Sequence, residues 1–369
     1  MKSVRSNDRE DDEAPLVVKT CIGVFFARIG KRAFKRYFSC FTSLVVSFSL
    51  FAILPQTALA AGDGGAYAGL EFYGSSQISR DEVEKLLGLR NGASYRSVVS
   101  ATERLKRALK GRKLEANIQA VTGDGTDIYL SVDILGDEEE LPSRILEEPQ
   151  HVNFRSEEPV QLLAKLHQRL DFLEAQGRPA TEDMRDGVKY YSDEPCNQMV
   201  RELLRHCQPM REEPLFLIDH DPNSLRRTCA VELLNWAGDI PDTALRLLPA
   251  VDDVDINVRT MVTRYLFKSL PFLPDDFPYA EMVEVYSRDL YRPSHDDRSK
   301  SLYMLLALVK KHPELIRQIK ALDAKRMVQL KKRSLVPSIK LACGQFERLF
   351  AGANAGLTDV KPNLDFLPP

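Results

Sequence analysis

The sequence predicts two regions of different class, an α+β domain over residues 67–135 and an all-α domain over residues 159–350. Two observations support this division. Over residues 67–135 the apolar pattern passes from strand to helix, to a second helix, and then to two alternating strands. From Ser156 onward, almost every segment has the period of a helix. A chain of 369 residues is long enough for two or three domains of ordinary size.

The composition, 44% hydrophobic and 28% charged, is that of a globular protein. The formal net charge is −2, but the charge is unevenly placed. Residues 1–60 hold nine of the 51 Lys/Arg and five of the 53 Asp/Glu, so the rest of the chain carries 42 basic and 48 acidic residues, a net charge of −6. Because no basic field recruits polyanions, we expect no nucleic-acid partner.

The first 60 residues have the order of features that is typical of a signal peptide with a long N-terminal region in front of its apolar run. KRAFKR at 31–36 precedes the uncharged run Phe41–Leu54, which Pro55 ends. Small residues follow at the positions of a cleavage site, namely Ala58, Ala60 and Ala61. The sequence therefore predicts a protein that is exported to the periplasm.

An uncleaved anchor is the alternative. Residues 41–61 are about as long as the roughly 20 residues that cross a bilayer. In that case the protein is membrane-anchored, faces the periplasm and contacts the membrane only through residues 41–61.

The α+β domain begins after a glycine-rich joint at residues 61–66. A short strand is predicted around Leu70. Ser79 and Glu82 have the spacing of a capping box, so a helix begins there, and Gly88 ends it.

A second helix is predicted over Tyr95–Leu109, followed by two strands. Residues Leu114–Val121 alternate between apolar and polar, and the turn Thr122–Gly125 contains the Asp-Gly pair of a hairpin. The last strand places four apolar residues on one face, at Ile128, Leu130, Val132 and Ile134. The result is a three-stranded sheet with two helices on one side.

This order of elements resembles the POTRA (polypeptide-transport-associated) domain. The resemblance rests on LEFYGSSQIS, the helix DEVEKLLGL, the turn RNGAS, the helix end ALKGRKL and the closing hairpin. It implies a periplasmic domain that binds polypeptides, with Leu114–Val121 as an edge strand. An open edge accepts a strand from a partner. The predicted partner-binding residues are Leu114, Ala116, Ile118 and Ala120.

Residues 136–158 are acidic, contain two prolines with a third directly after them at Pro159, and are predicted to be a linker. Within residues 215–350, an Asp-rich turn followed by a hydrophobic-Arg pair occurs at Arg226 and again at Arg259, with weaker copies at Lys300 and Lys340. The spacings of 33, 41 and 40 residues resemble HEAT repeats, which form an α-solenoid. We expect both arginines to hold the acidic turn of the adjacent repeat.

An irregular helical bundle is the alternative to repeats, and residues 351–369 are predicted to be a loosely held tail. The chain shows no histidine pair, nucleophile elbow or phosphate loop, so we expect neither a metal nor a cofactor. Four cysteines are expected to be buried small hydrophobic residues, with a Cys207–Cys229 bridge as the alternative in an oxidising compartment: Cys196, Cys207, Cys229 and Cys343.

Taken together, these features predict a non-enzymatic adaptor or scaffold in envelope assembly or secretion. Its partner is expected to be a protein of the envelope or of a secretion system. Two alternatives remain open: a single-pass anchored protein of the envelope or cell-division type, and an enzyme whose site has no recognisable motif.

Overall fold

The computed structural model describes residues 65–73, 77–122, 127–135, 144, 146 and 148–352. All of them belong to one compact unit, Ile53–Pro369. The predicted signal peptide with Ala58, Ala60 and Ala61, nearly all of the joint and of the tail, and much of the predicted linker lie outside the described residues.

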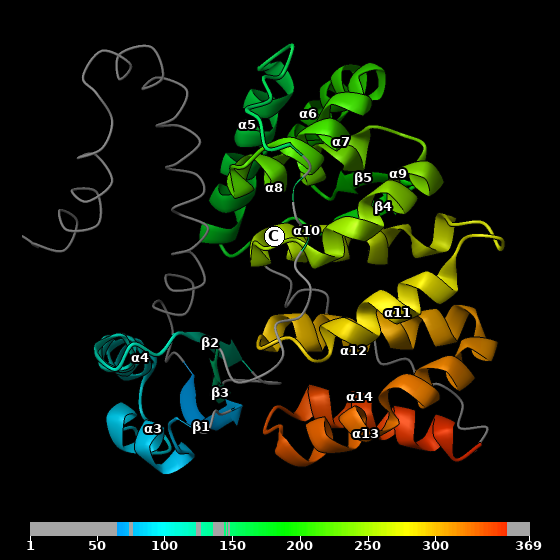
Figure 1. Cartoon of the computed structure of the whole chain (residues 1–369). Coiled ribbons are helices and arrows are strands. Elements are labelled where there is room, and N and C mark those ends of the chain that lie inside the picture. Colours follow the sequence, from blue (N-terminus) through cyan, green and yellow to red (C-terminus); the bar gives the residue numbers. More distant parts are fainter. Residues whose placement is uncertain are drawn as a thin grey trace, which may run out of the picture. The chain divides into compact units, whose positions relative to one another are not determined.

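The α/β region has the five elements that the sequence predicted, in the predicted order (Figure 1). They are β1 (Ala66–Tyr73), α3 (Arg80–Leu87), α4 (Tyr95–Gly111), β2 (Ala116–Thr122) and β3 (Asp127–Ile134). The sheet order is β1-β3-β2, with β1 parallel and β2 antiparallel to the central β3. A small three-stranded sheet is therefore confirmed.

Local sequence signals set the helix ends in this region. Ser79 and Glu82 form the predicted capping box, in which the Glu82 backbone N–H donates to Ser79 Oγ and the Ser79 N–H donates to Glu82 Oε2. Gly88 ends α3 in the left-handed conformation, with a φ of 61° that a residue without Cβ adopts freely. Buried side chains of α3, α4 and the sheet form one apolar cluster that includes Leu70, Leu105 and Leu130.

The rest of the described chain is mostly helical. Two long helices, α5 (Glu158–Ala175) and α6 (Glu194–Cys207), come first. Four helix pairs follow: α7 (Glu212–His220) with α8 (Ser224–Leu233), α9 (Ile240–Leu247) with α10 (Ile256–Ser269), α11 (Tyr279–Asp289) with α12 (His295–Lys311), and α13 (Ile316–Arg333) with α14 (Pro337–Phe350). Short 3-10 segments occur at η2 (Gln208–Met210), η3 (Leu234–Trp236), η4 (Leu248–Asp252), η5 (Leu270–Phe272) and η6 (Pro313–Leu315).

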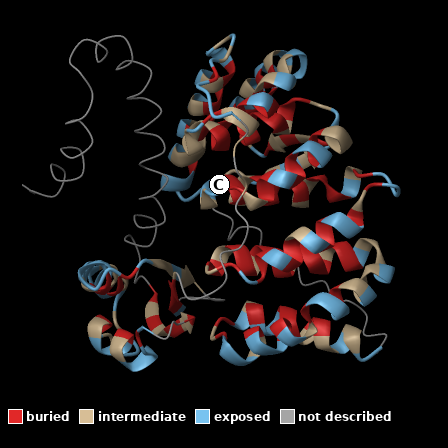
Figure 2. Cartoon of the chain, in the orientation of Figure 1, coloured by how far each residue is buried: buried red, intermediate tan, exposed pale blue. Residues whose placement is uncertain are grey.

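The second helices of these pairs stack in chain order. Helix α8 packs on α10, α10 on α12, and α12 on α14. The buried residues lie where stacked helices meet, and the exposed ones lie on their outer faces (Figure 2). We call these four pairs the helix array.

A hairpin that the sequence analysis missed lies between α5 and α6, so the expected all-α domain is wrong at this point. Strands β4 (Glu182–Arg185) and β5 (Val188–Tyr191) pair through a two-residue turn. Its residues Asp186 and Gly187 have φ angles of 50° and 78°. The Asp-Gly pair is the strongest short-range sign of such a turn. A Cβ on Gly187 would lie 2.1 Å from Ile240 Cδ1, so the position also needs glycine for space.

The described part of the predicted linker is hydrogen-bonded to the turns of the array. The N–H of Arg144 donates to the carbonyl oxygen of Asp252 at 2.8 Å. Nearer to α5, the Gln150 N–H donates to the His220 carbonyl at 3.0 Å, and the Val152 N–H donates to Asp221 Oδ2 at 3.3 Å. This segment therefore runs along the turns that join α7 to α8 and α9 to α10.

A repeated turn joins the two helices within each of three pairs. Each second helix has an N-cap residue, and an arginine follows it four positions later, giving Asn223 and Arg227 in α8, Asp255 and Arg259 in α10, and Ser294 and Arg298 in α12. Nη1 of each arginine donates to the carbonyl oxygen six residues before it, at 2.9, 2.8 and 2.9 Å respectively. The repeat in the sequence is therefore a repeat of hydrogen bonds.

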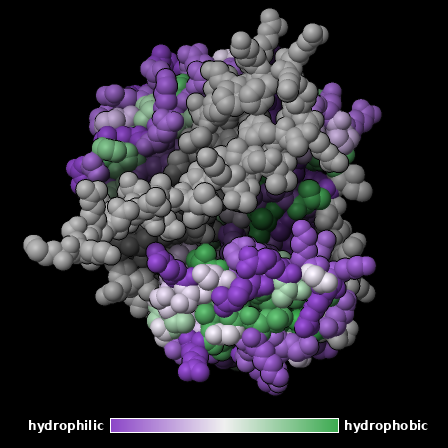
Figure 3. Space-filling view, turned by 90° about the vertical axis from the view of Figure 1, so that its left-hand side faces the viewer, coloured by the Kyte–Doolittle hydropathy of each residue, from purple (hydrophilic) through white to green (hydrophobic). Residues whose placement is uncertain are grey.

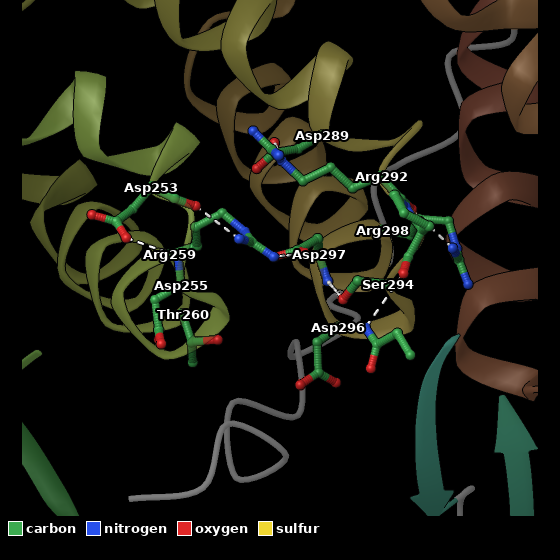
Figure 4. Close-up of polar contacts among 12 residues, drawn as sticks. Asp253, Asp255, Arg259, Thr260, Asp289, Arg292, Ser294, Asp296, Asp297 and Arg298 are labelled. Carbon is green, nitrogen blue, oxygen red and sulfur yellow. Dashed lines mark hydrogen bonds and ion pairs between the residues drawn. The ribbon is translucent and has the colours of Figure 1, made fainter. Parts of the chain in front are cut away.

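The first two of these guanidinium groups also bind a carboxylate of the next unit. Arg227 binds Asp253 through two contacts of 2.9 and 2.7 Å. Arg259 binds Asp297 at 3.2 and 2.6 Å, as Figure 4 shows. The expectation that Arg259 contacts an adjacent unit is thus confirmed, although Asp297 lies in the first turn of α12.

The alignment of Arg226 with Arg259 is wrong by one residue. Nε of Arg226 donates to Asp221 within its own turn at 2.9 Å, and its Nη2 donates to the Val152 carbonyl. Arg227 is the residue equivalent to Arg259. Two adjacent arginines fit the apolar period equally well, and only the spacing from the N-cap separates them.

Candidate functional site

The predicted edge strand is an edge of the sheet, with a shifted start. Strand β2 begins at Ala116, whereas Leu114 lies before it, is buried in the α/β core and donates its N–H to the Leu109 carbonyl. Leu114 is therefore a core residue and does not lie on the strand. The structure brings Ala116, Ile118 and Ala120 together at alternate positions of β2.

The backbone groups of these three residues point away from the sheet. The Leu135 N–H donates to the Glu115 carbonyl at 2.8 Å, which makes Glu115 an inward-bonded position. Bonding alternates along an antiparallel pair, so Asn117 and Gln119 also bond to β3. It follows that Ala116, Ile118 and Ala120 direct their N–H and C=O groups outward. Within the described part of the chain, no hydrogen bond occupies these outward groups.

The edge of β2 is bordered on both faces. On one face lies α4, which packs against β2. Arg104 of α4 reaches the Leu87 carbonyl of α3 at 2.9 Å, so the opposite flank of α4, with Val99, Thr102 and Lys106, borders the free edge.

On the other face, β2 is tied to the start of α12. Nδ2 of Asn117 donates to the Pro293 carbonyl, and Oε1 of Gln119 accepts from the Asp296 N–H, each at 3.3 Å. The turn before α12 thus holds the side of the strand that faces away from α4.

The start of the opposite edge of the sheet is covered. The Tyr67 N–H donates to the Ala93 carbonyl, and the Gly92 N–H donates to the Tyr67 carbonyl, both at 2.9 Å. Further along β1, Leu335 Cδ1 approaches Gly69 so closely that a Cβ there would lie 2.7 Å from it. Strand β2, by contrast, presents three successive outward positions from Ala116 to Ala120 whose backbone groups have no partner among the residues that the structure describes.

The second face of the sheet is polar and buried against the array. The Glu71 and Asp133 side chains are each 1% exposed. Asp133 binds Arg298, the third arginine of the repeated turn, at 2.6 and 3.3 Å. This carboxylate comes from β3 rather than from the next helix pair, α13 and α14 (Figure 4 shows Arg298 beside the strands).

Glu71 lies at the centre of a second buried contact. Its Oε1 accepts from the Ser334 hydroxyl at 2.5 Å and from the N–H groups of Leu335 and Val336 at 2.7 and 3.2 Å. Its Oε2 lies 3.1 Å from His295 Nδ1. Burial alone would raise the pKa of Glu71, but the interaction with His295 and the hydrogen bonds from Ser334 and Val336 lower it to about 2.

A further cluster of buried charged groups surrounds the β4–β5 hairpin. Lys189 Nζ lies 3.1 Å from Glu182 and 3.8 Å from Glu232, and Glu232 lies 2.8 Å from His167 Nε2. Burial would raise the pKa of Glu232, but His167 and the nearby cations lower it to about 2. Arg264 and Lys268 also bind Glu182. These contacts fix the hairpin to α8 and α10.

Several other features bear on the predicted chemistry. The cysteines Cys196, Cys207, Cys229 and Cys343 are all buried and unbonded. Among the described residues, no cluster of His, Cys, Asp and Glu has a metal-binding arrangement, and no helix is long and apolar enough to span a bilayer.

Comparison with protein-family models, with curated proteins and with solved structures gives no match to this chain. The POTRA and HEAT resemblances therefore stay predictions.

Proposed function

We propose that this chain is an exported, non-enzymatic adaptor that binds an extended segment of a partner protein along β2. The observation that carries the proposal is the run of outward N–H and C=O groups at Ala116, Ile118 and Ala120. Such a run forms main-chain hydrogen bonds with any extended peptide, and the flanking side chains select among peptides. The POTRA-like order of elements supports the same assignment.

In this proposal the helix array serves as a scaffold. Its helix pairs are HEAT-like, and an array of stacked pairs offers a continuous surface for a second protein. The export-type features of residues 1–60 support a place in the periplasm and a partner from envelope assembly or secretion. N-terminal sequencing of the mature protein distinguishes a cleaved soluble protein from an uncleaved anchor. The first residue is Ala61 in the cleaved protein and Met1 in the anchor.

Proline substitution tests the edge directly. Ala120→Pro removes an outward N–H and leaves the bonds between β2 and β3 in place, so the sheet is expected to remain folded. A photo-crosslinking residue at Thr122 of the full chain, in the native host, then reports what lies along the edge. We expect crosslinks to an extended segment of another protein, which Ala120→Pro abolishes and Ala120→Ser preserves.

The proposal fails if the crosslinks persist in Ala120→Pro, or if none form to a protein. Ile118→Pro removes a second outward N–H and serves as a repeat of the test at another position. Gln119→Pro is the contrasting variant, because it removes an inward N–H and is expected to disrupt the sheet itself. Circular dichroism of each variant separates loss of binding from loss of fold.

A further inference from the structure

A hollow of ≈ 420 Å³ lies between the end of α3 and the first half of α4, and three arginines line it: Arg90, Arg96 and Arg104. The hydroxyl-bearing residues Ser97 and Ser100 also line it. It lies on the flank of α4 that carries Arg104, opposite the flank that borders β2. Any ligand here is therefore independent of the proposed edge site.

The positive charge of this hollow is uncompensated. No acidic residue is among those that line it, and within the described chain the side chains of Arg90 and Arg96 have no ion pair or hydrogen bond. Arg104 is held in position by its bond to the Leu87 carbonyl. Lys106 of the same helix, by contrast, is paired with Glu103. Figure 3 views this face, on which hydrophilic side chains surround a hydrophobic strip over α3 and α4.

We propose that this hollow binds a phosphate group. Arginine presents its donors in a planar fork that matches phosphate oxygens, and serine hydroxyls donate to the oxygens that remain. A carboxylate has only two oxygens and is satisfied by one guanidinium, whereas three guanidinium groups suit a tetrahedral dianion. A soluble phosphate and a phospholipid head group share this chemistry.

The test uses the full chain with two probes, inorganic phosphate in calorimetry and phosphatidylcholine vesicles with or without phosphatidic acid in co-sedimentation. Arg90→Gln with Arg96→Gln removes two cations from the hollow. The matched control, Arg107→Gln with Lys110→Gln, removes two cations from α4 outside it. We expect the first pair to weaken binding about tenfold or more and the control less than about twofold. Ser100→Glu, which places a carboxylate in the hollow, is expected to act like the first pair.

Binding of inorganic phosphate supports a soluble ligand, and binding of the phosphatidic acid vesicles alone supports a lipid head group. The proposal is overturned if neither probe binds, or if the control pair weakens binding as much as the first pair does. The second result would indicate diffuse attraction by the basic helix. Unfolding curves of all variants are expected to match, because the side chains of Arg90 and Arg96 have no bonded partner among the described residues.

Discussion

Two junctions in this protein use the same contact between a guanidinium and a carboxylate. Within the helix array, Arg227 binds Asp253, only 26 positions along the chain, and both side chains are 1% exposed. Between the array and the sheet, Arg298 binds Asp133, 165 positions away, and the two side chains are 3% and 1% exposed. The geometry is alike, although one junction joins neighbouring turns and the other joins two regions.

The comparison indicates how the α/β region is attached. Its polar sheet face supplies the carboxylate that the third arginine binds, in place of a carboxylate from the next helix pair, α13 and α14. Glu71 adds a contact without a counterpart elsewhere in the described array, by accepting the N–H groups that precede α14. The free edge of β2 is therefore held in a fixed position beside the start of α12, rather than carried on a free domain.

The array contact is expected to give the largest effect. Arg227→Ala leaves Asp253 buried without a counter-charge, which costs about 3–5 kcal/mol of unfolding free energy. Urea unfolding followed by the fluorescence of Trp236, the only tryptophan, measures it.

Arg205→Ala is the matched control, because it breaks an ion pair with Glu202 in which the two side chains are 72% and 49% exposed and stay hydrated. Arg227→Met combined with Asp253→Leu is expected to recover at least about half of the loss, since it leaves no unpaired charge. A cost below about 1 kcal/mol for Arg227→Ala would show that the repeated turn contributes little to the array.

The unfolding free energy is expected to depend on pH through the carboxylate of Glu71 at the junction between the sheet and the array. Its pKa is lowered from 4.5 to about 2 in the folded protein, so its contribution is present above pH 4.5 and is lost as the pH falls through 2. The shift corresponds to about 3 kcal/mol at neutral pH. Glu71→Gln is expected to lose about that amount at pH 7 and to match the parent protein near pH 2.

Urea unfolding at a series of pH values measures this difference, with the exposed Glu115→Gln as the control. Circular dichroism reports on both regions, whereas Trp236 reports on the array. We expect the two signals to coincide in the parent protein and to separate in Glu71→Gln. A pH dependence unchanged by Glu71→Gln would contradict a stabilising role for this carboxylate at the junction.

The sequence was sufficient for the local structure of the α/β region, because Ser79, Glu82 and Gly88 act within a few residues of their own helix. It could not show that the second face of the sheet is buried. Alternation separates two faces, but a polar face reads as solvent-facing unless its partner is known. For this reason Glu71 and Asp133 escaped notice, since their partners lie in the array.

Other misses had a local signal. The Asp186-Gly187 turn stands between two short extended runs, yet the surrounding helical period hid it. The N-cap Asn223 marks Arg227 rather than Arg226, once the same spacing is seen from Asp255 to Arg259. For the candidate site, the alternation of β2 supplied Ala116, Ile118 and Ala120. Leu114 was misplaced on the strand because the turn after α4, in which its N–H bonds to the Leu109 carbonyl, leaves no mark in the apolar period.

The smallest expected effect concerns an aromatic contact at the junction. The guanidinium carbon of Arg298 lies 3.8 Å from the centre of the Tyr73 ring, a stacking that Arg227 does not have among the described residues. Tyr73→Leu is expected to cost about 1–2 kcal/mol, as a desolvated cation–π contact does, whereas Tyr73→Phe keeps the ring and should stay within about 0.5 kcal/mol of the parent protein. Urea unfolding of both variants, repeated in the Arg298→Met background, measures the pairwise term. If Tyr73→Leu costs as much there as in the parent, the ring serves only as packing, and the junction depends on the same ionic contact as the array.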